Sequence, residues 1–212
     1  MTPRIKARLV TTMLAASVAA LAGCAARPPR AYRVVPLQGP SYTIQEGVVA
    51  ISAATFRMTI LPLDDLARGA FIRARAEGAT DPFGPDHGGT PRYITFRLMI
   101  QNTGDTEPVV FQPQNIYLAS SAGDRLFPLD FPQAYSRFAG SVNNDPRMLE
   151  DLAKYLFDVG VSVLPGGRVE GLLVYPAGRI EAKKLRMEFN FQQTGSSASP
   201  SYDIYFIKEP LS

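Results

Sequence analysis

The chain has 212 residues but only one cysteine, one histidine and no tryptophan. A lone cysteine excludes an internal disulfide, and a lone histidine excludes a zinc site built from several imidazoles. Any Ser-His-Asp arrangement would have to use His87, and the sequence has no nucleophile elbow to meet it. No apolar stretch approaches the roughly 20 residues that a membrane-spanning helix needs. We therefore expect a protein without catalytic activity, cofactor or spanning helix.

The N-terminus has the composition of an export signal. The first eight residues carry three basic side chains and no acid, and Leu9–Ala20 is an uncharged, mostly apolar run. A basic start, an apolar centre and a small-residue exit predict a secretory signal peptide over residues 1–23. The basic residues are separated, which favours the general secretory route over the twin-arginine route.

The single cysteine ends this segment, in the tetrapeptide Leu21-Ala22-Gly23-Cys24. This tetrapeptide resembles the lipobox of bacterial lipoproteins, in which a leucine and two small residues precede an invariant cysteine. The resemblance implies cleavage before Cys24 and acylation of Cys24, which would attach the protein to the lipid bilayer. Ala25 follows the cysteine where an aspartate would favour the inner membrane, and this resembles an outer-membrane sorting signal. The alternative is an ordinary signal peptide in which Cys24 has no such role.

The net charge of +3 comes from segments outside the expected domain. Without the signal peptide, 19 of the 22 basic residues remain against 19 acidic ones, and residues 42–212 carry 16 basic and 19 acidic residues. The basic character therefore disappears once the chain is processed. We expect no nucleic-acid partner.

Proline spacing divides the exported chain into a tether and one domain. The prolines of residues 24–41 predict an extended tether, acylated at Cys24, and no repeat interrupts the single domain expected over residues 42–212. Within the domain, apolar and polar residues alternate with a period of two, which is typical of strands with one buried face. Strands are expected at 93–102 and 184–191, and also around 43–53, 109–112, 116–126, 161–176 and 202–207.

Two segments have the periodicity of helices. Asp64 is a suitable N-cap for a helix from Asp65 to Ala76, with Gly78 as a stop. Asp145 followed by Pro146 is a suitable start for a second helix that Gly160 ends. Its apolar stripe would consist of Leu149, Leu152, Ala153 and Leu156. The fold class expected is mainly β: an antiparallel sandwich with one or two short inserted helices, the longer of which would cover an open end or a sheet edge.

The order of strands and turns from Tyr93 to Phe191 also resembles a class of small bacterial envelope lipoproteins. The motifs that carry this resemblance are Asn102-Thr103-Gly104-Asp105, Ser121-Ala122-Gly123-Asp124 and Pro165-Gly166-Gly167. The resemblance implies an immunoglobulin-like β-sandwich and brings no catalytic residues with it.

The loop over residues 78–92 is rich in glycine and proline and contains the only candidates for a metal site, Asp81, Asp86 and His87. Oxygen ligands from loops suit Ca²⁺, but the spacing does not match an EF-hand. The alternative is a solvated loop without a ligand. We expect no metal site here.

Four aromatic residues, Phe127, Phe131, Tyr135 and Phe138, gather in one segment. They form either a surface for a partner or a small cluster packed under a loop. We expect a membrane-anchored binding or scaffolding module that faces the periplasm and contacts another envelope protein. The alternatives are a module that binds a small ligand or Ca²⁺ through the 78–92 loop and, least favoured, an envelope hydrolase.

Overall fold

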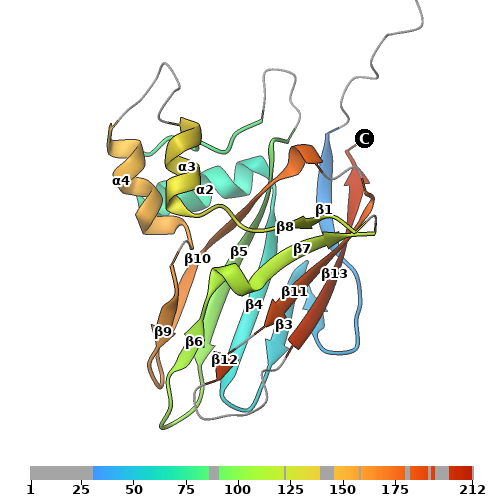
Figure 1. The fold of residues 1–212 in the computed structure, drawn as a ribbon, viewed down its shortest axis with the longest axis vertical. Helices are drawn as coiled ribbons and strands as arrows, with labels where there is room; N and C mark the ends of the chain where they lie inside the picture. Colours follow the sequence, from blue (N-terminus) through green and yellow to red (C-terminus); the bar gives the residue numbers. More distant parts are fainter. Residues whose placement is uncertain are drawn as a thin grey trace, which may run out of the picture.

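The computed structural model describes residues 31–85, 91–121, 123–138, 146–157, 159–179, 182–190, 192–193 and 201–211. These residues form three antiparallel sheets and three α-helices (Figure 1). Sheet A has the order β1 (Tyr32–Pro36), β13 (Ser201–Pro210), β11 (Lys184–Asn190), β7 (Ile116–Ser120) and β8 (Arg125–Leu126). Sheet B has the order β10 (Arg168–Pro176), β5 (Tyr93–Asn102), β4 (Phe56–Leu63), β3 (Val48–Ser52) and β2 (Thr43–Gln45). Sheet C consists of β12 (Gln192–Gln193), β6 (Val109–Phe111) and β9 (Val161–Val163), and the helices are α2 (Asp65–Arg75), α3 (Phe131–Phe138) and α4 (Pro146–Tyr155).

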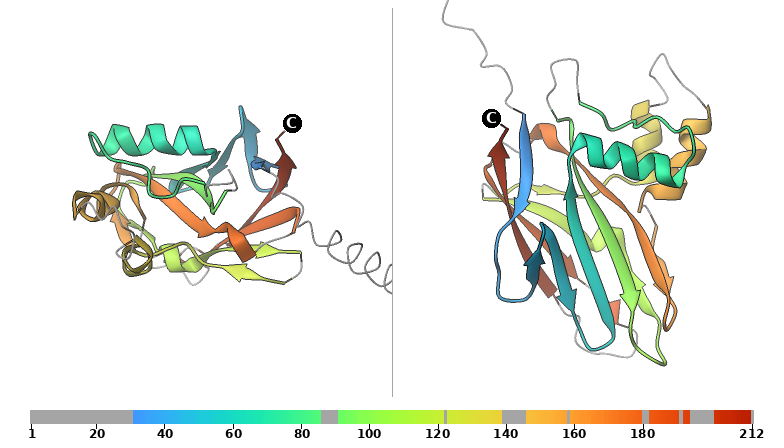
Figure 2. Two further views of the ribbon diagram at one scale, coloured as in Figure 1. Left: turned by 90° about the horizontal axis from the view of Figure 1, so that it is seen from above. Right: turned by 180° about the vertical axis from the view of Figure 1, so that it is seen from behind.

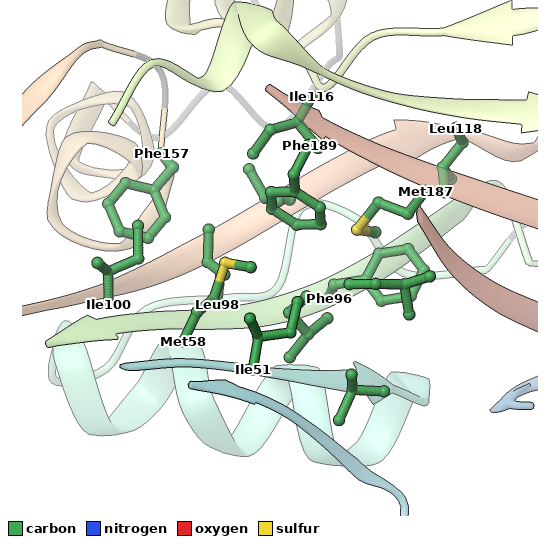
Figure 3. Packing of buried hydrophobic residues seen from close by; sticks show 14 of the residues in the cluster. Ile51, Met58, Phe96, Leu98, Ile100, Ile116, Leu118, Phe157, Met187 and Phe189 are labelled. Atoms are coloured by element: carbon green, nitrogen blue, oxygen red, sulfur yellow. The ribbon is translucent and has the colours of Figure 1, made fainter. Parts of the chain in front are cut away.

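Sheets A and B pack face to face, and the main hydrophobic core lies between them (Figure 3). The predicted alternation on β5 and β11 is confirmed, because every second residue of each strand is buried in this core. Phe96 of sheet B joins the two sheets: its ring centroid lies 4.9 Å from that of Phe206 in sheet A and 6.0 Å from that of Tyr175. Phe191, the last residue of the predicted strand, lies outside the described residues.

Helix α2 lies on the outer face of sheet B, and α3 and α4 lie beside it next to β10 (Figure 2). Strand β10 is buried on both of its faces because it lies between the two cores. Leu173 and Tyr175 point into the core between the sheets, whereas Leu172 and Val174 pack under the helices. The second core consists of Ile72, Phe83, Tyr93, Leu129, Ala134, Phe138, Leu152, Tyr155, Leu156, Leu172 and Val174.

Phe157, just after α4, fastens this helical layer to β10. Its N–H donates a hydrogen bond to the Leu172 carbonyl (2.9 Å), and its ring lies against Gly171. A Cβ at position 171 would lie 2.8 Å from the Phe157 ring, so the close approach requires glycine. Helix α4 thus covers β10, the edge strand of sheet B, as the sequence predicts.

The tether predicted over residues 24–41 is wrong for its second half. Tyr32–Pro36 form β1, which pairs with β13 along its whole length. Tyr42, where the domain was expected to begin, is buried, and its hydroxyl donates to the Leu37 carbonyl (2.6 Å) and accepts from the Tyr205 N–H (3.1 Å). An edge strand tolerates proline at its end as readily as an extended tether does, so the proline spacing could not distinguish the two. The domain therefore begins near Tyr32.

The first predicted helix is confirmed and the second is shorter than predicted. Asp64 caps α2 by accepting a hydrogen bond from the Ala67 N–H (2.8 Å), and Gly78 has the positive φ of a stop. Helix α4 ends at Tyr155 rather than at Gly160. In its stripe, Leu152 and Leu156 are buried, but Ala153 is exposed, and Tyr155 takes its place in the core.

The strands predicted on either side of Pro165-Gly166-Gly167 do form, and they join different sheets: β9 pairs with β6, and β10 pairs with β5. Strand β4 and helix α3 were not predicted, and α3 brings the α-helices to three among the described residues.

Replacing Phe96 with alanine removes the ring that contacts both sheets. We expect the Phe96→Ala variant to lose about 3–5 kcal/mol of unfolding free energy, because a cavity would remain in a fully buried site. Urea unfolding followed by far-UV circular dichroism measures this loss. Phe127→Ala is the matched control: its side chain is 53% exposed, and the change should stay within about 0.5 kcal/mol. Equal losses in the two variants would contradict the described core.

Candidate functional site

The residues of the predicted anchor, Leu21, Ala22, Gly23 and Cys24, lie outside the described residues. The described chain starts at Ala31, whose carbonyl accepts a hydrogen bond from the Leu211 N–H (3.0 Å). The start of β1 and the C-terminal end of β13 therefore lie side by side at one end of the molecule (Figure 1). An anchor upstream of Ala31 would hold the domain by this end. Among the described residues, no helix has the length and apolar composition to cross a membrane.

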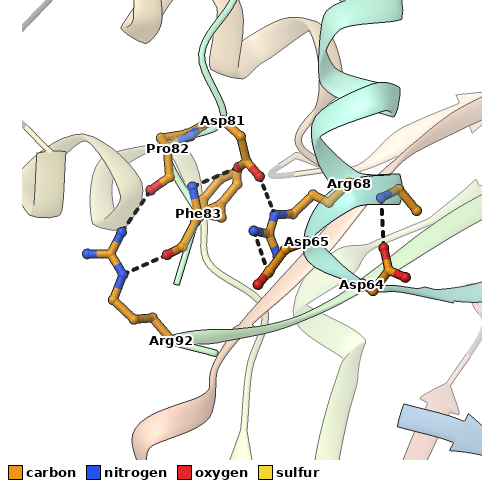
Figure 4. A network of polar contacts seen from close by, with 9 residues as sticks. Asp64, Asp65, Arg68, Asp81, Pro82, Phe83 and Arg92 are labelled. Atoms are coloured by element: carbon orange, nitrogen blue, oxygen red, sulfur yellow. Dashed lines mark hydrogen bonds and ion pairs between the residues drawn. The ribbon is translucent and has the colours of Figure 1, made fainter. Parts of the chain in front are cut away.

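The described part of the 78–92 loop is built around an ion pair (Figure 4). Asp81 accepts hydrogen bonds from the Arg68 Nε (2.8 Å) and from the Phe83 N–H (2.9 Å). Arg68 is 1% exposed, and its Nη2 lies 2.8 Å from an Asp65 carboxylate oxygen, in an ion pair that is not aligned as a hydrogen bond. Both oxygens of Asp81 are thus engaged by groups of the protein, which leaves this carboxylate poorly placed to bind Ca²⁺.

This network also places an aromatic residue in the second core. The Phe83 ring makes edge-to-face contacts with the rings of Tyr93, Phe138 and Tyr155, at centroid distances of 5.5, 5.6 and 6.5 Å. Arg92 closes the loop by donating to the Gly84 carbonyl (2.8 Å). The Asp81–Arg68 ion pair and the ring contacts of Phe83 thus hold residues 81–83 against the helices. Asp86 and His87 lie outside the described residues, and within those residues no three His, Cys, Asp or Glu side chains gather as a metal site would require.

The four aromatic residues considered as a partner surface have different environments in and around α3. Phe138 is buried in the second core and Phe131 packs against it, whereas Phe127 is 53% and Tyr135 46% exposed. Tyr135 neighbours Phe131, with ring centroids 6.2 Å apart, but Phe127 neighbours Tyr117 of β7 at 5.8 Å. The four residues therefore do not form one surface: Phe138 and Phe131 match the packed cluster that was the alternative, whereas Phe127 and Tyr135 are exposed beside different neighbours.

Phe127 lies at an apolar groove of about 270 Å³. The groove runs between the turn Pro113–Asn115 and the start of α3, where Asp130 accepts a hydrogen bond from the Gln133 N–H (2.7 Å). Pockets for drug-sized ligands occupy about 300–1,000 Å³, so this groove better suits one or two apolar side chains of a partner. Its lining residues are Pro113, Gln114, Phe127, Pro128, Leu129, Asp130, Gln133 and Phe157.

A larger cleft of about 430 Å³ opens between β1 and the start of α2. Two hydroxyl groups of residues that line it, those of Tyr32 and Thr95, are buried and have no hydrogen-bond partner among the residues that the structure describes. Burial, together with the nearby Asp65 carboxylate, raises the pKa of Tyr32 to about 12. The Tyr32 phenol therefore stays protonated at neutral pH. The two uncharged hydroxyls can form hydrogen bonds with a ligand in the cleft, but they are not suited to act as a general base.

Removing the Asp81 carboxylate leaves the buried Arg68 guanidinium with Asp65 as its remaining ion-pair partner. We expect Asp81→Ala to lower the unfolding free energy by up to about 3–5 kcal/mol, because the buried guanidinium would lose its hydrogen-bonded carboxylate and keep a partner that is partly exposed and not aligned as a hydrogen bond. Asp65 is 41% exposed, so Asp65→Ala, the control, should cost less than about 1 kcal/mol. Thermal unfolding of both variants decides the point, and a smaller loss for Asp81→Ala than for Asp65→Ala would contradict the network.

The Tyr32→Phe variant tests the unpaired hydroxyl in the cleft. At pH 7 we expect unchanged or higher stability, by up to about 1 kcal/mol, because no hydrogen bond is lost. Because the folded pKa is raised, the wild type should lose stability as the pH rises from the unfolded pKa of about 10 through 12. The variant should lose less over that range in urea titrations at each pH. A fall of more than about 1 kcal/mol at pH 7 would show that the hydroxyl is paired.

Comparison with known proteins does not identify a family. No protein-family model matches the chain, and no curated protein matches it. Among solved structures, the crystal structure of the yjhA protein from Bacillus subtilis is similar over 73% of this chain and 93% of that chain, at 11% sequence identity and a TM-score of 0.41. A likeness of this degree carries no argument about function, which therefore has to come from the residues themselves.

Proposed function

We propose that the protein is a lipoprotein of the bacterial envelope, anchored through acylated Cys24 and facing the periplasm from the outer membrane. Its domain, an immunoglobulin-like β-sandwich in this proposal, acts without catalysis as a binding or scaffolding module for another envelope protein. The observation that carries the proposal is the position of the only cysteine. It directly follows Leu21-Ala22-Gly23, at the end of a basic-then-apolar segment.

The geometry of the domain supports an anchor at this point. Strand β1 begins at Tyr32, so about seven residues would separate Cys24 from the first described strand. At about 3.3–3.6 Å per residue, this link spans at most about 25 Å. The domain would therefore be held close to the bilayer by the end at which β1 begins.

The sheet arrangement supports the sandwich of the proposal. Sheets A and B enclose one core, and their strands pair antiparallel across long sequence separations, such as β1 with β13 and β7 with β11. Relative to a simple sandwich, helices are inserted between β4 and β5 and between β8 and β9.

The groove at Phe127 supports a protein as the partner. It combines an exposed aromatic ring, two prolines and the side chains of two glutamines in a space suited to an apolar side chain. Exposed aromatic residues in shallow apolar depressions are the usual anchors of protein interfaces.

Two variants of the full-length protein test the partner contact. Crosslinking in intact envelopes, followed by purification, should recover one stoichiometric partner with the wild type. Phe127→Asp should lose most of it, because a charge would enter an apolar contact. Tyr135→Asp, the matched control at an exposed aromatic residue that does not line the groove, should retain it. Equal recovery with both variants would contradict the groove as the contact.

The Cys24→Ser variant tests the anchor in the same cells. We expect the wild type to incorporate labelled palmitate and the variant to incorporate none and to remain uncut before residue 24, because the thiol that takes the acyl chains is absent. Equal incorporation of label by the two proteins, or cleavage of the variant before residue 24, would contradict anchoring through Cys24.

A further inference from the structure

Half of the outer face of sheet B is left open by the helices. In the right-hand view of Figure 2, α2 crosses the upper part of this sheet, and the lower parts of β4, β5 and β10 are uncovered. The covered half buries Thr95, Leu172 and Val174. The strand register places Arg57, Gln101 and Arg168 side by side in one row of the open half, with Thr59, Met99 and Glu170 in the next row.

Three arginines engage one carboxylate on this open half, and a fourth, Arg57, lies in the adjoining row of the sheet and completes the cluster. Glu170, with a side chain 10% exposed, accepts a hydrogen bond from the Arg97 Nε (2.6 Å), pairs with Arg75 of α2 and lies 3.8 Å from the Arg168 Nη2. Arg57 is exposed, and among the described residues no carboxylate lies within ion-pair distance of it. The cluster therefore carries three positive charges in excess, on a domain whose residues 42–212 have more acids than bases.

The guanidinium groups of Arg75 and Arg97 are held in place and retain donors. Phe71 lies between two of them: the Arg75 and Arg97 guanidinium carbons are 5.0 and 5.4 Å from its ring centroid. Burial alone would raise the pKa of Glu170, but hydrogen bonds and charge from Arg97 and Arg75 outweigh it and hold the pKa below its usual value. Each arginine has five N–H groups, more than one carboxylate can accept, so donors remain for an outside anion.

The shape of the surface favours a chain segment over a flat membrane. Helix α2 stands on the sheet as a wall beside the open half, and the cluster lies at the foot of that wall, so a planar bilayer would meet α2 first. Leu61, Thr59 and Met99 are partly exposed among the arginines and give the floor an apolar component. An amphipathic segment with acidic side chains matches both the charge and the apolar floor.

We infer that the open half of sheet B is a second docking surface, which binds an acidic amphipathic segment of a partner protein alongside α2. This surface is separate from the Phe127 groove and does not depend on acylation of Cys24. Arg57 and Arg168 bind the acidic side chains of that segment. Arg75 and Arg97, which Glu170 and Phe71 hold in place, add to the positive potential of the surface.

Binding of a defined peptide to the full-length protein in neutral detergent tests this inference. The probe is a fluorescein-labelled 21-residue peptide with three repeats of Glu-Ala-Leu-Glu-Glu-Leu-Ala, followed by fluorescence anisotropy. We expect the double variant Arg57→Glu/Arg168→Glu to bind at least about tenfold more weakly, because like charges would face each other. The control Arg73→Glu/Arg137→Glu has the same net charge, is altered on α2 and α3 away from the cluster, and should bind like the wild type.

A charge-swapped probe makes the test independent of folding defects. The peptide with lysine in place of every glutamate should bind Arg57→Glu/Arg168→Glu better than the wild type. The inference is overturned if wild-type protein fails to bind the acidic peptide at low salt. It is also overturned if both double variants lose affinity equally, or if vesicles containing phosphatidylglycerol bind the wild type in competition with the peptide.

Discussion

Burial of β10 on both faces is the constraint on which the rest of the structure depends. The residues from Leu172 to Tyr175 point alternately to the core between the sheets and to the core beneath the helices. The strand can therefore keep its place in sheet B only if both layers form together. The Phe157 ring packs against Gly171 and so links the helices to β10. The Phe96 ring, in the core between the sheets, contacts Phe206 of sheet A. Apolar burial of this extent gives a chain of this size a stable core without a disulfide.

Much of this architecture follows from sequence pattern. Alternation in residues 93–102 and the Asp64 cap are local signals, and each local preference agrees with the final structure. Because β10 is buried on both faces, its apolar and polar residues do not alternate. Its sequence therefore predicts a strand but does not indicate which strand it pairs with. Helix α3 was missed although Phe131, Tyr135 and Phe138 are spaced four and three residues apart, as on one face of a helix; their aromatic character was interpreted as a cluster and their period was overlooked. The boundary at Tyr32 was missed because proline is compatible with both a tether and an edge strand.

The candidate sites were harder to predict than the fold, since they depend on residues far apart in the sequence. Asp81 seemed a possible cation ligand until its partner Arg68 was located in α2. The three arginines paired with Glu170 come from α2, β5 and β10, Arg57 of β4 lies in the adjoining row, and the nearly balanced charge of the whole chain conceals the cluster. Composition describes a surface only on average, whereas strand register decides which charges become neighbours.

In this proposal, the domain is held close to a membrane at the end where β1 begins, and one apolar groove and one basic sheet face are available to protein partners. The covalent anchor at Cys24 is the central claim. Mass spectrometry of the N-terminal peptide from the mature, membrane-extracted protein tests that claim most directly. The account predicts a peptide that begins at Cys24 and carries a thioether-linked diacylglycerol. A mature N-terminus elsewhere, or a free Cys24 thiol, would contradict it.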